Sequence, residues 1–530
     1  MNQSVRAEAE RWLAGEPDAD IRAELEALLA GSADELAQRF DGRLQFGTAG
    51  LRAAVGAGPQ RMNRLVVRQA AAGLAAYLLA TDTRARERGV IIGYDARRKS
   101  DVFALDTACV MAACGIRAML FDQVVPTPVL AWSITEIDAA AGVVVTASHN
   151  PPADNGYKVY LGDGAQIVPP HDIGIAERID EVDPVNVDLA PRQHPLIESV
   201  GAELIDAYIS AAPGVRLRPD VPGVTVAYTA MHGVGGAVLV RAFEAAGLPP
   251  PVVVPEQFEP DGTFPTVSFP NPEEPGAMDL LLDVATKSGA MAAVANDPDA
   301  DRLGAAIPQP DGSWRRLGGD ELGWLMAEHI LGHTAGDDRL VVTTLVSSSL
   351  LGRMAAEHGV HHAETFTGFK WIGRTILDRP AERFVFGYEQ ALGYLVTHQP
   401  LDKDGITAAI MFAEVAATAA ADGVTLQDRL DAIAERYGRH VMAELSVPMD
   451  PAQAAARVEV LRASPPAEIA GRRVVEVSTF PEANLLRLVL DGGVRVQVRP
   501  SGTEPKVKLY GEAVGEDPAP YVDALAALLD

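Results

Sequence analysis

The sequence predicts an α/β fold, and three observations lead to that class. Strand-like and helix-like stretches alternate over most of the 530 residues, which is typical of α/β layers. The last stretch, residues 441–530, instead shows short strands with alternating apolar residues, as in an α+β domain. Because one domain holds about 150 residues, the chain should form three or four domains.

The first α/β unit is expected after two acidic amphipathic helices near the N-terminus. Its elements are a strand at 90–95 ("VIIGYD"), a helix at 101–115 ("DVFALDTACVMAACG"), a strand at 117–121 and a strand at 142–147. The apolar run at 143–145 lacks alternation, which indicates a strand covered on both faces. Pro151 and Pro152 cannot continue this strand. Ser148 should therefore be displayed at the carboxyl edge of the sheet, where α/β proteins usually place their sites.

The next two units repeat this alternation. The second runs from a strand at 224–230 through a Gly-rich helix start at 231–236 to a strand and loop at 291–302 ("MAAVANDPDADR"). The third runs from 339–348 through 367–376 ("TGFKWIGRTI") to 383–394 ("RFVFGYEQALGY"). In each unit a strand ends in a loop rich in Ser, Asp, Glu or Gly, so three sheets could each contribute a loop to one shared cleft.

The C-terminal part is expected to form short strands and one terminal helix. The strands are at 472–477, 485–490, 494–500 and 507–512. Polar, Pro-rich stretches at 180–222 and 308–319 are candidate linkers between the units.

Charge and composition limit the classes of partner. The formal net charge of −27 should repel nucleic acid and anionic membranes. The N-terminus has no apolar core of the signal-peptide type, and no apolar run approaches the ~20 residues needed to span a bilayer. Cys109 and Cys114 lie on one predicted helix, roughly 7.5 Å apart along its axis, which is too far for a disulfide. We therefore expect a cytoplasmic monomer or homodimer without nucleic acid or membrane as partner.

Ser148 is the first candidate for chemistry. A serine hydroxyl is a poor nucleophile unless a base or a pre-installed group changes its reactivity. His149 and Lys158 are near it in sequence, although adjacency alone does not make a catalytic pair. The alternative is a turn in which Ser148 and Asn150 cap backbone amides.

The stretch "NDPDADR" at 296–302 is a candidate metal site. Asp297, Asp299 and Asp301 alternate, so in extended backbone their carboxylates point the same way. Three such carboxylates beside an apolar strand need a counter-charge, and oxygen-only ligands favour Mg²⁺. Arg302 supplies only one cation. The alternative is a solvated acidic turn.

A third candidate is "VRPSGTEPKVKLY" at 498–510, which has the groups that bind a phosphate dianion. It combines a guanidinium, two hydroxyls, a glycine that lets backbone amides point outward, and a lysine. These residues are Arg499, Ser501, Gly502, Thr503 and Lys506. A surface turn is the alternative.

Two further stretches carry weaker signals. Glu389, in "FGYEQALGY" at 386–394, follows a predicted buried strand and could accept hydrogen bonds from sugar hydroxyls, or it could belong to a helix-start turn. The stretch "FGTAGLR" at 46–52 suggests an anion contact through Arg52, or a structured turn.

Together and in this order, the five stretches resemble those of the α-D-phosphohexomutase family, the phosphoglucomutases and phosphomannomutases. "TASHNP" resembles its phosphoserine loop, "DPDADR" its metal loop, "GYEQALGY" its sugar-recognition loop and "RPSGTEPK" its phosphate loop. The resemblance spans about residues 46–510. "TGFKWIG" and "GYEQALGY" are most similar to the phosphoglucomutase-2 and phosphopentomutase-like branch.

The resemblance implies four domains around a central cleft. Three are related mixed-sheet α/β domains at 1–215, 216–325 and 326–440, and a smaller α+β domain occupies 441–530. It also implies a phosphoryl group on Ser148 and one Mg²⁺ held by Ser148, Asp297, Asp299 and Asp301. The residues expected around the phosphoserine are Arg52, His149, Lys158 and Arg302, with Lys158 as a candidate general acid or base. Those expected to bind substrate are Lys370, Gly387, Glu389, Arg499, Ser501, Gly502, Thr503 and Lys506.

The implied activity is a phosphosugar mutase that interconverts hexose 1-phosphate and hexose 6-phosphate, of glucose or mannose. The reaction would pass through the phosphoserine and a sugar 1,6-bisphosphate, which would also act as activator. One departure concerns the sugar: the glucose and mannose mutases carry Ser two residues after the Glu, where this chain has Ala391. A phosphopentomutase of the same fold is therefore an alternative. Two others are a Mg²⁺-dependent sugar phosphatase and a non-catalytic sugar-phosphate-binding protein.

Overall fold

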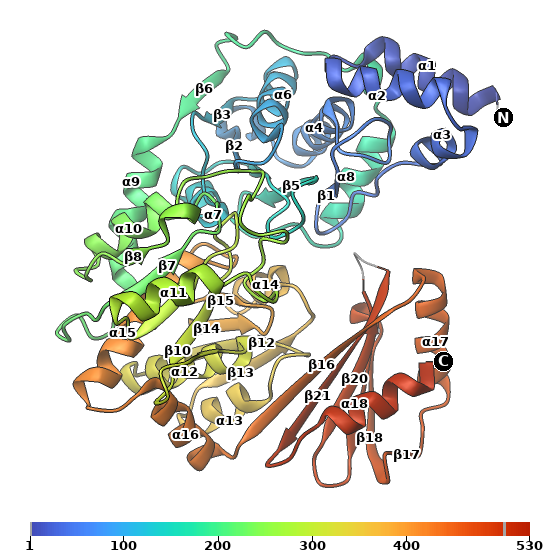
Figure 1. The fold of residues 1–530 in the computed structure, drawn as a ribbon. Helices are drawn as coiled ribbons and strands as arrows, with labels where there is room; N and C mark the ends of the chain where they lie inside the picture. Colours follow the sequence, from blue (N-terminus) through green and yellow to red (C-terminus); the bar gives the residue numbers. More distant parts are fainter. Residues whose placement is uncertain (1–2, 502–504, 530) are drawn as a thin grey trace.

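Four β-sheets follow one another along the chain in the computed structural model, which describes residues 3–501 and 505–529. Figure 1 shows them along an arc that begins at the N-terminal sheet and ends at the C-terminal one. The first three sheets are mixed and carry helices, and the fourth is antiparallel. The predicted fold class is therefore confirmed.

The first sheet has six strands in the order β1-β5-β4-β2-β3-β6. β2, β3, β4 and β6 are parallel, whereas β5 pairs antiparallel with β4 and with β1. The strands are β1 (Leu51–Ala54), β2 (Val90–Tyr94), β3 (Ala118–Phe121), β4 (Ala141–Val145), β5 (Asp154–Leu161) and β6 (Ile197–Val200). The helices are α4 (Arg64–Thr81), α5 (Ala85–Arg88), α6 (Ser100–Ala113), α7 (Thr127–Glu136) and α8 (His171–Asp180).

β4 is buried along its whole length, as its unbroken apolar run predicts. Neighbouring residues of β2 show why both faces are covered: Val90 and Ile92 join the core on one side, and Ile91 joins the core on the other. Cys109 and Cys114 are both free thiols, as their spacing predicts.

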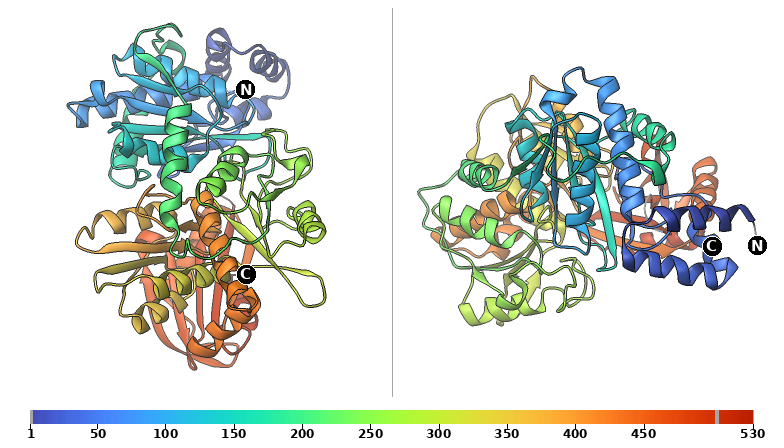
Figure 2. Two further views of the ribbon diagram at one scale, coloured as in Figure 1. Left: turned by 90° about the vertical axis from the view of Figure 1, so that its left-hand side faces the viewer. Right: turned by 90° about the horizontal axis from the view of Figure 1, so that it is seen from above.

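Three helices precede the first sheet, one more than expected. They are α1 (Gln3–Gly15), α2 (Ala19–Ala30) and α3 (Ala33–Phe40). Gly31 and Ser32 separate the last two, because Ser32 accepts a hydrogen bond from the Asp34 N–H and so starts a new helix. All three lie at the outer side of the first sheet in each view (Figures 1 and 2).

The second sheet has five strands in the order β11-β10-β9-β7-β8. β7, β8 and β9 are parallel, and β10 and β11 add antiparallel pairs. The strands are β7 (Val226–Thr229), β8 (Val252–Val253), β9 (Ala292–Ala295), β10 (Gly304–Pro308) and β11 (Trp314–Arg316), and the helices are α9 (Ala202–Ala211), α10 (Gly236–Ala245) and α11 (Asp279–Ser288). β9 is fully buried and ends directly before the three aspartates.

Both stretches that we predicted as linkers contain regular structure, and their role as boundaries between domains stays a prediction. Residues 180–222 include β6, which pairs with β3, and α9, which packs on α7 and α10. Residues 308–319 include β11, which pairs with β10. Proline and polar residues mark the ends of elements, and here several short elements lie between such ends.

The third sheet has the order β13-β12-β14-β15, with only β15 antiparallel. The strands are β12 (Arg339–Thr344), β13 (His361–Thr365), β14 (Arg383–Glu389) and β15 (Gly393–Leu395). The helices are α12 (Gly319–His333), α13 (Leu350–Glu357), α14 (Phe369–Leu377), α15 (Gly405–Ala421) and α16 (Leu426–Tyr437).

The fourth sheet contains the four expected strands and two more. Its order is β16-β21-β20-β19-β18-β17, antiparallel throughout. The strands are β16 (His440–Pro448), β17 (Glu468–Ile469), β18 (Arg472–Phe480), β19 (Leu485–Leu490), β20 (Arg495–Pro500) and β21 (Lys506–Val514), and the helices are α17 (Pro451–Ala463) and α18 (Ala519–Ala526). β16, β17 and α17 were not predicted.

Helix α15 packs between the second and third units, on α10 and β9 of the second and on α12 and β15 of the third. All its residues from 405 to 419 are buried. Its charged side chain, Glu414, pairs with Arg216 at 2.9 Å and hydrogen-bonds His329 Nε2 at 3.0 Å. At its start Asp404 accepts hydrogen bonds from the N–H groups of Ile406 and Thr407. The loop before α15 is therefore held rigidly where the three units meet.

Among the described residues, no single helix has both the length and the apolar character to cross a membrane. The pair α15 and α16 would pass that test only together, and it is bent by 90°.

A close approach of two helices provides a test of this fold. A Cβ atom on Gly73 of α4 would lie 2.7 Å from the backbone N and Cα of Ile179 in α8. Gly73→Ala should therefore separate the helices and destabilise the protein by roughly 1–3 kcal/mol. Gly332→Ala is the matched control, because a Cβ there meets nothing within 4 Å. It should be neutral or stabilising by up to about 1 kcal/mol. Thermal unfolding measures both; equal midpoints for Gly73→Ala and the parent protein would contradict the contact.

Candidate active site

Ser148 lies in a turn at the carboxyl end of β4. Its φ is 50°, and the left-handed region costs a residue with a Cβ about 1–2 kcal/mol. Its N–H donates to Thr146 Oγ1 at 2.8 Å, and the residue is 3% exposed. The strand thus ends in a tightly held turn that presents a hydroxyl, as expected.

Asp297, Asp299 and Asp301 lie in the loop after β9 and are completely buried. One carboxylate oxygen from each lies within 4.8 Å of those from the other two. The convergence that we predicted is present, but its cause differs, because the backbone turns at Pro298 and Ala300 has a φ of 58°. The loop is closed by Asn296, whose Nδ2 donates to Arg302 O at 2.7 Å.

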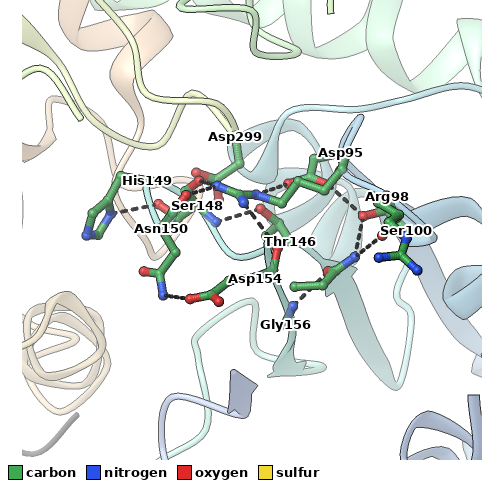
Figure 3. Close-up of polar contacts among 12 residues, drawn as sticks. Asp95, Arg98, Ser100, Thr146, Ser148, His149, Asn150, Asp154, Gly156 and Asp299 are labelled. Atoms are coloured by element: carbon green, nitrogen blue, oxygen red, sulfur yellow. Dashed lines mark hydrogen bonds and ion pairs between the residues drawn. The ribbon is translucent and has the colours of Figure 1, made fainter. Parts of the chain in front are cut away.

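The serine turn and the aspartate loop contact each other directly, although they belong to different sheets. Ser148 Oγ donates to Asp297 Oδ2 at 2.6 Å. Thr127, the first residue of α7, donates from its hydroxyl to Asp299 Oδ2 at 2.7 Å. Figure 3 shows Ser148 beside Asp299, with His149 on one side and Asn150 below. The first two units are therefore joined at these side chains.

Lys158 links the same two units through its charge. Its Nζ lies 2.7 Å from Asp299 Oδ2 and 2.8 Å from Asp301 Oδ2. Burial opposes the charged ammonium, but the two carboxylates raise the pKa of Lys158 above its usual value. The side chain is therefore protonated near neutral pH.

The three aspartates fit a divalent cation. The Oδ1 atoms of Asp299 and Asp301 are buried and accept no hydrogen bond, which is costly for carboxylates without another counter-charge. Burial, and then the charges of these two neighbours, raise the pKa of Asp297 well above its usual range. A cation bound here would satisfy the two orphaned oxygens and favour the ionised form of Asp297.

Further cations surround the trio. Lys403, in the loop before α15, places Nζ 3.3 Å from Asp301 Oδ2. The backbone N–H of Arg302 donates to Asp297 Oδ1 at 3.0 Å, whereas its guanidinium lies 3.4 Å from Glu273. Arg52 Nη1 donates to Asn150 Oδ1 at 3.1 Å. Burial, followed by the charges of Arg302 and Arg52, holds the pKa of His149 well below its usual value. The His149 ring is therefore neutral, and Nδ1 lies 3.2 Å from Ser148 Oγ.

The third unit brings Glu389 and Lys370 toward the first. Glu389 ends β14 and is 7% exposed; burial raises its pKa, opposed by Lys403 and Arg302. Lys370, in α14, hydrogen-bonds Thr48 of the "FGTAGLR" loop, and burial lowers its pKa to about 8. Gly387 does not join them, because it is buried inside β14 and a Cβ there would lie 3.1 Å from side-chain atoms of Ile372 and Phe384.

The predicted phosphate loop joins β20 to β21. Arg499 is half-buried at the end of β20, and the Ser501 N–H donates to Lys506 O at 2.9 Å. Gly502 and Thr503 lie outside the described residues. The C-terminal sheet is docked on the third unit through Glu512, which pairs with Arg495 at 2.7 Å and accepts from Ser348 Oγ at 2.6 Å.

Three residues of the site were not predicted: Thr127, Lys403 and Arg97. Thr127 starts α7 between two prolines, and the sequence carries no signal for a role in the site. Lys403 stands in "DKDG" directly before the apolar helix α15, and a lone lysine there is a signal that could have been used. Arg97 follows β2 in "DARR", at the carboxyl end of a buried strand, the same position that singled out Ser148.

Four consecutive parts of the chain match descriptions of one protein family. Residues 43–186, 206–312 and 318–437 match "Phosphoglucomutase/phosphomannomutase, alpha/beta/alpha" domains I, II and III. Residues 447–524 match its C-terminal domain.

Individual relatives cover nearly the whole chain. The "Probable phosphomannomutase" of Haemophilus influenzae is 44% identical over 86% of this chain and 94% of its own length. The human "Phosphopentomutase" is 34% identical over 95% of this chain and 90% of its own length. A phosphoglucomutase/phosphomannomutase family protein from Burkholderia thailandensis has the same fold, with a TM-score of 0.72 at 22% identity over 92% of this chain and 96% of that one.

Removing one carboxylate should weaken cation binding. Asp301→Asn keeps the size of the side chain but removes a charge next to an orphaned buried oxygen, so we expect the Kd for Mg²⁺ to rise at least about tenfold. Asp311→Asn, in the exposed turn between β10 and β11, is the control and should leave it unchanged. Calorimetric titration and the rise of the unfolding midpoint with Mg²⁺ measure binding. Equal affinities for Asp301→Asn and the parent protein would contradict the site.

Proposed function

The chain belongs to the phosphoglucomutase/phosphomannomutase family, and we propose that it is a phosphosugar mutase that moves a phosphoryl group between two positions of one sugar through Ser148. The contact between Ser148 Oγ and Asp297 at 2.6 Å carries this proposal. It places a hydroxyl against three carboxylates that fit a cation, with Lys158 bridging two of them.

Ser148 would carry the phosphoryl group in the resting enzyme. In the first half of the reaction, the bond from phosphorus to Ser148 Oγ breaks while a bond forms to a free sugar hydroxyl, whose proton passes to a base. Such a transfer spreads negative charge over three phosphoryl oxygens, so catalysis consists mainly of positioning and charge stabilisation. Lys158, Arg302 and Arg52 are the cations of the first two units that would provide it.

Two side chains are candidates for the proton transfer. His149 is neutral and lies 3.2 Å from Ser148 Oγ, which suits a base that accepts a proton. Against the effect of burial, the carboxylates of Asp299 and Asp301 raise the pKa of Lys158, so Lys158 would act in the return step as an acid. Lys403, which also contacts Asp301 Oδ2, is a second cation at that oxygen.

We propose Mg²⁺ as the cation of Asp297, Asp299 and Asp301, with an oxygen on Ser148 as a further ligand. When bound, it would neutralise charge on the phosphoryl oxygens. The buried, unpartnered Oδ1 atoms of Asp299 and Asp301 support this choice, since oxygen-only donor sets suit Mg²⁺.

The substrate would be held at its other end by the third and fourth units. Glu389 would accept hydrogen bonds from sugar hydroxyls, and Lys370 lies at the contact with the first unit. Arg499, Ser501, Gly502, Thr503 and Lys506 would bind the phosphate that does not react. The first transfer yields a sugar bisphosphate, which must turn round and return its other phosphoryl group to Ser148. We propose the same bisphosphate as activator, since it phosphorylates the empty serine.

The sugar is proposed to be a hexose, glucose or mannose, with interconversion of its 1- and 6-phosphates. The relative at 44% identity carries the name phosphomannomutase, which supports this choice. A pentose is the second candidate, because Ala391 lacks the hydroxyl of the hexose mutases and the relatives at 34% identity include a phosphopentomutase. A coupled assay across glucose, mannose and ribose 1-phosphates separates the two.

The location, the partners, the oligomeric state and the domain bounds are also proposals. Two free cysteines favour a reducing, cytoplasmic location, and the negative net charge argues against nucleic acid and anionic membranes as partners. We propose a monomer or homodimer, with domains at 1–215, 216–325, 326–440 and 441–530.

Removal of the Ser148 hydroxyl tests the central proposal. Ser148→Ala should lower kcat more than about 1,000-fold, because no other group would accept the phosphoryl. The parent protein should carry a phosphate on Ser148 by mass spectrometry, and glucose 1,6-bisphosphate should stimulate it. Ser210→Ala, on the exposed face of α9, is the control and should keep full activity. Retained activity in Ser148→Ala would refute the nucleophile; hydrolysis without isomerisation would indicate a phosphatase.

Loss of the distal guanidinium should weaken substrate binding. Arg499→Ala removes a charge-assisted contact worth about 1.5–3 kcal/mol, so the KM for both phosphosugars should rise about 10- to 100-fold. Arg473→Ala, on the exposed side of β18 in the same sheet, should leave the KM unchanged. Steady-state kinetics in both directions measure this, and an unchanged KM for Arg499→Ala would remove Arg499 from the phosphate site.

A further inference from the structure

The side chain of Arg97 is enclosed by the backbone of the Ser148 turn. Nη1 donates to the carbonyl oxygens of Pro151 at 2.7 Å and Asp154 at 3.1 Å. Nη2 donates to the carbonyl oxygens of Ser148 and Asn150, both at 2.5 Å. One guanidinium therefore binds four carbonyls of the segment 148–154, in which residues 148–153 form a turn and Asp154 is the first residue of β5.

The Arg97 side chain also contacts Asp95. Asp95 lies 3.3 Å from Arg97 Nε, and Asp95 Oδ1 accepts from Ser100 Oγ at 2.7 Å. Figure 3 shows Asp95 and Ser100 on one side of this arrangement and Ser148 and Asn150 on the other. Arg97 is 3% exposed, so its charge is offset by Asp95 and the four carbonyl dipoles.

The outer face of Arg97 is covered by the second unit. The Arg97 guanidinium lies 4.9 Å from the centre of the Phe264 ring, a cation–π contact. Gly262, in the same loop, leaves so little room that a Cβ would lie 2.2 Å from Ala96 O and 2.7 Å from Arg97 Cα. The second unit, which carries the aspartates, thus packs on the residue that organises the serine turn.

We propose that Arg97 is a positioning residue for Ser148. It holds the turn in the left-handed conformation that brings Ser148 Oγ against Asp297, and Phe264 fixes Arg97 from the second unit. The inference rests on the proposed function, because Ser148 must exchange a phosphoryl group for its position to matter. Within the turn Arg97 contacts only backbone oxygens, and its other partners are Asp95 and Phe264, so its effect reaches the reaction through the position of Ser148.

The test compares Arg97→Lys and Phe264→Leu with the parent protein. A lysine keeps the charge but cannot span four carbonyls, so the rate of transfer from phosphorylated Ser148 to sugar 1-phosphate should fall about 100-fold, with KM changed less than about threefold. Phe264→Leu keeps the four hydrogen bonds and should lower the same rate about tenfold. Rates are measured in single-turnover experiments and normalised to the amount of protein that carries a phosphate on Ser148. Unfolded protein then does not contribute to the rate.

Arg98→Lys is the matched control, since the Arg98 side chain is exposed and pairs with Asp20 at the surface. It should transfer at the parent rate. Transfer at the parent rate in both Arg97→Lys and Phe264→Leu would overturn the inference; if Arg97→Lys does not fold, Phe264→Leu decides alone.

A second measurement separates this inference from the proposed function. Amide hydrogen exchange in residues 148–154 should be at least about tenfold faster in Arg97→Lys than in the parent and unchanged in Arg98→Lys. This holds even if the parent protein shows no mutase activity, which would overturn the proposed function alone. Unchanged exchange in Arg97→Lys would overturn the positioning role.

Discussion

Three buried carboxylates within 4.8 Å of one another are the constraint on which the rest of the structure depends. Such a group is unfavourable unless positive charge surrounds it, and the chain supplies that charge from distant positions. Lys158 comes from an antiparallel strand of the first sheet, and Lys403 comes from the loop before α15 in the third unit. The Oδ1 atoms of Asp299 and Asp301 still lack a hydrogen-bond partner after both lysines are placed, which is why we propose that a divalent cation binds here.

The contacts between the four units follow from this constraint. The first two units meet through Ser148, Thr127 and Lys158 and are rigidly joined at the reacting end. The third unit shares the apolar core around α15, so it is fixed to the same frame. The fourth unit is docked on the third through Glu512, which accepts hydrogen bonds from Ser348 Oγ and from the Ser349 N–H. The unit proposed to bind the non-reacting phosphate is thus attached only through the third unit in these contacts, whereas the two units that carry Ser148 and the aspartates contact each other directly.

Sequence patterns predicted what depends on local chemistry. An unbroken apolar run stopped by two prolines was enough to place Ser148 at the edge of a buried strand, and alternating aspartates were enough to suggest a metal site. They could not predict that Pro298 and Ala300 turn the backbone, because convergence in a turn depends on φ and not on spacing. Thr127, Lys403 and Arg97 were missed because tertiary contacts alone bring them to the loops. The short elements inside the two predicted linkers were missed because prolines mark the ends of short elements as well as the gaps between domains.

The position of α15 has a consequence for the order of events during synthesis. Chains fold from the N-terminus as they leave the ribosome, yet the helix that packs between the second and third units starts only at Gly405. Until it emerges, the aspartate loop lacks Lys403 and the earlier units keep apolar surface exposed. The site can therefore form completely only after the last quarter of the chain, which contains this helix, has been synthesised.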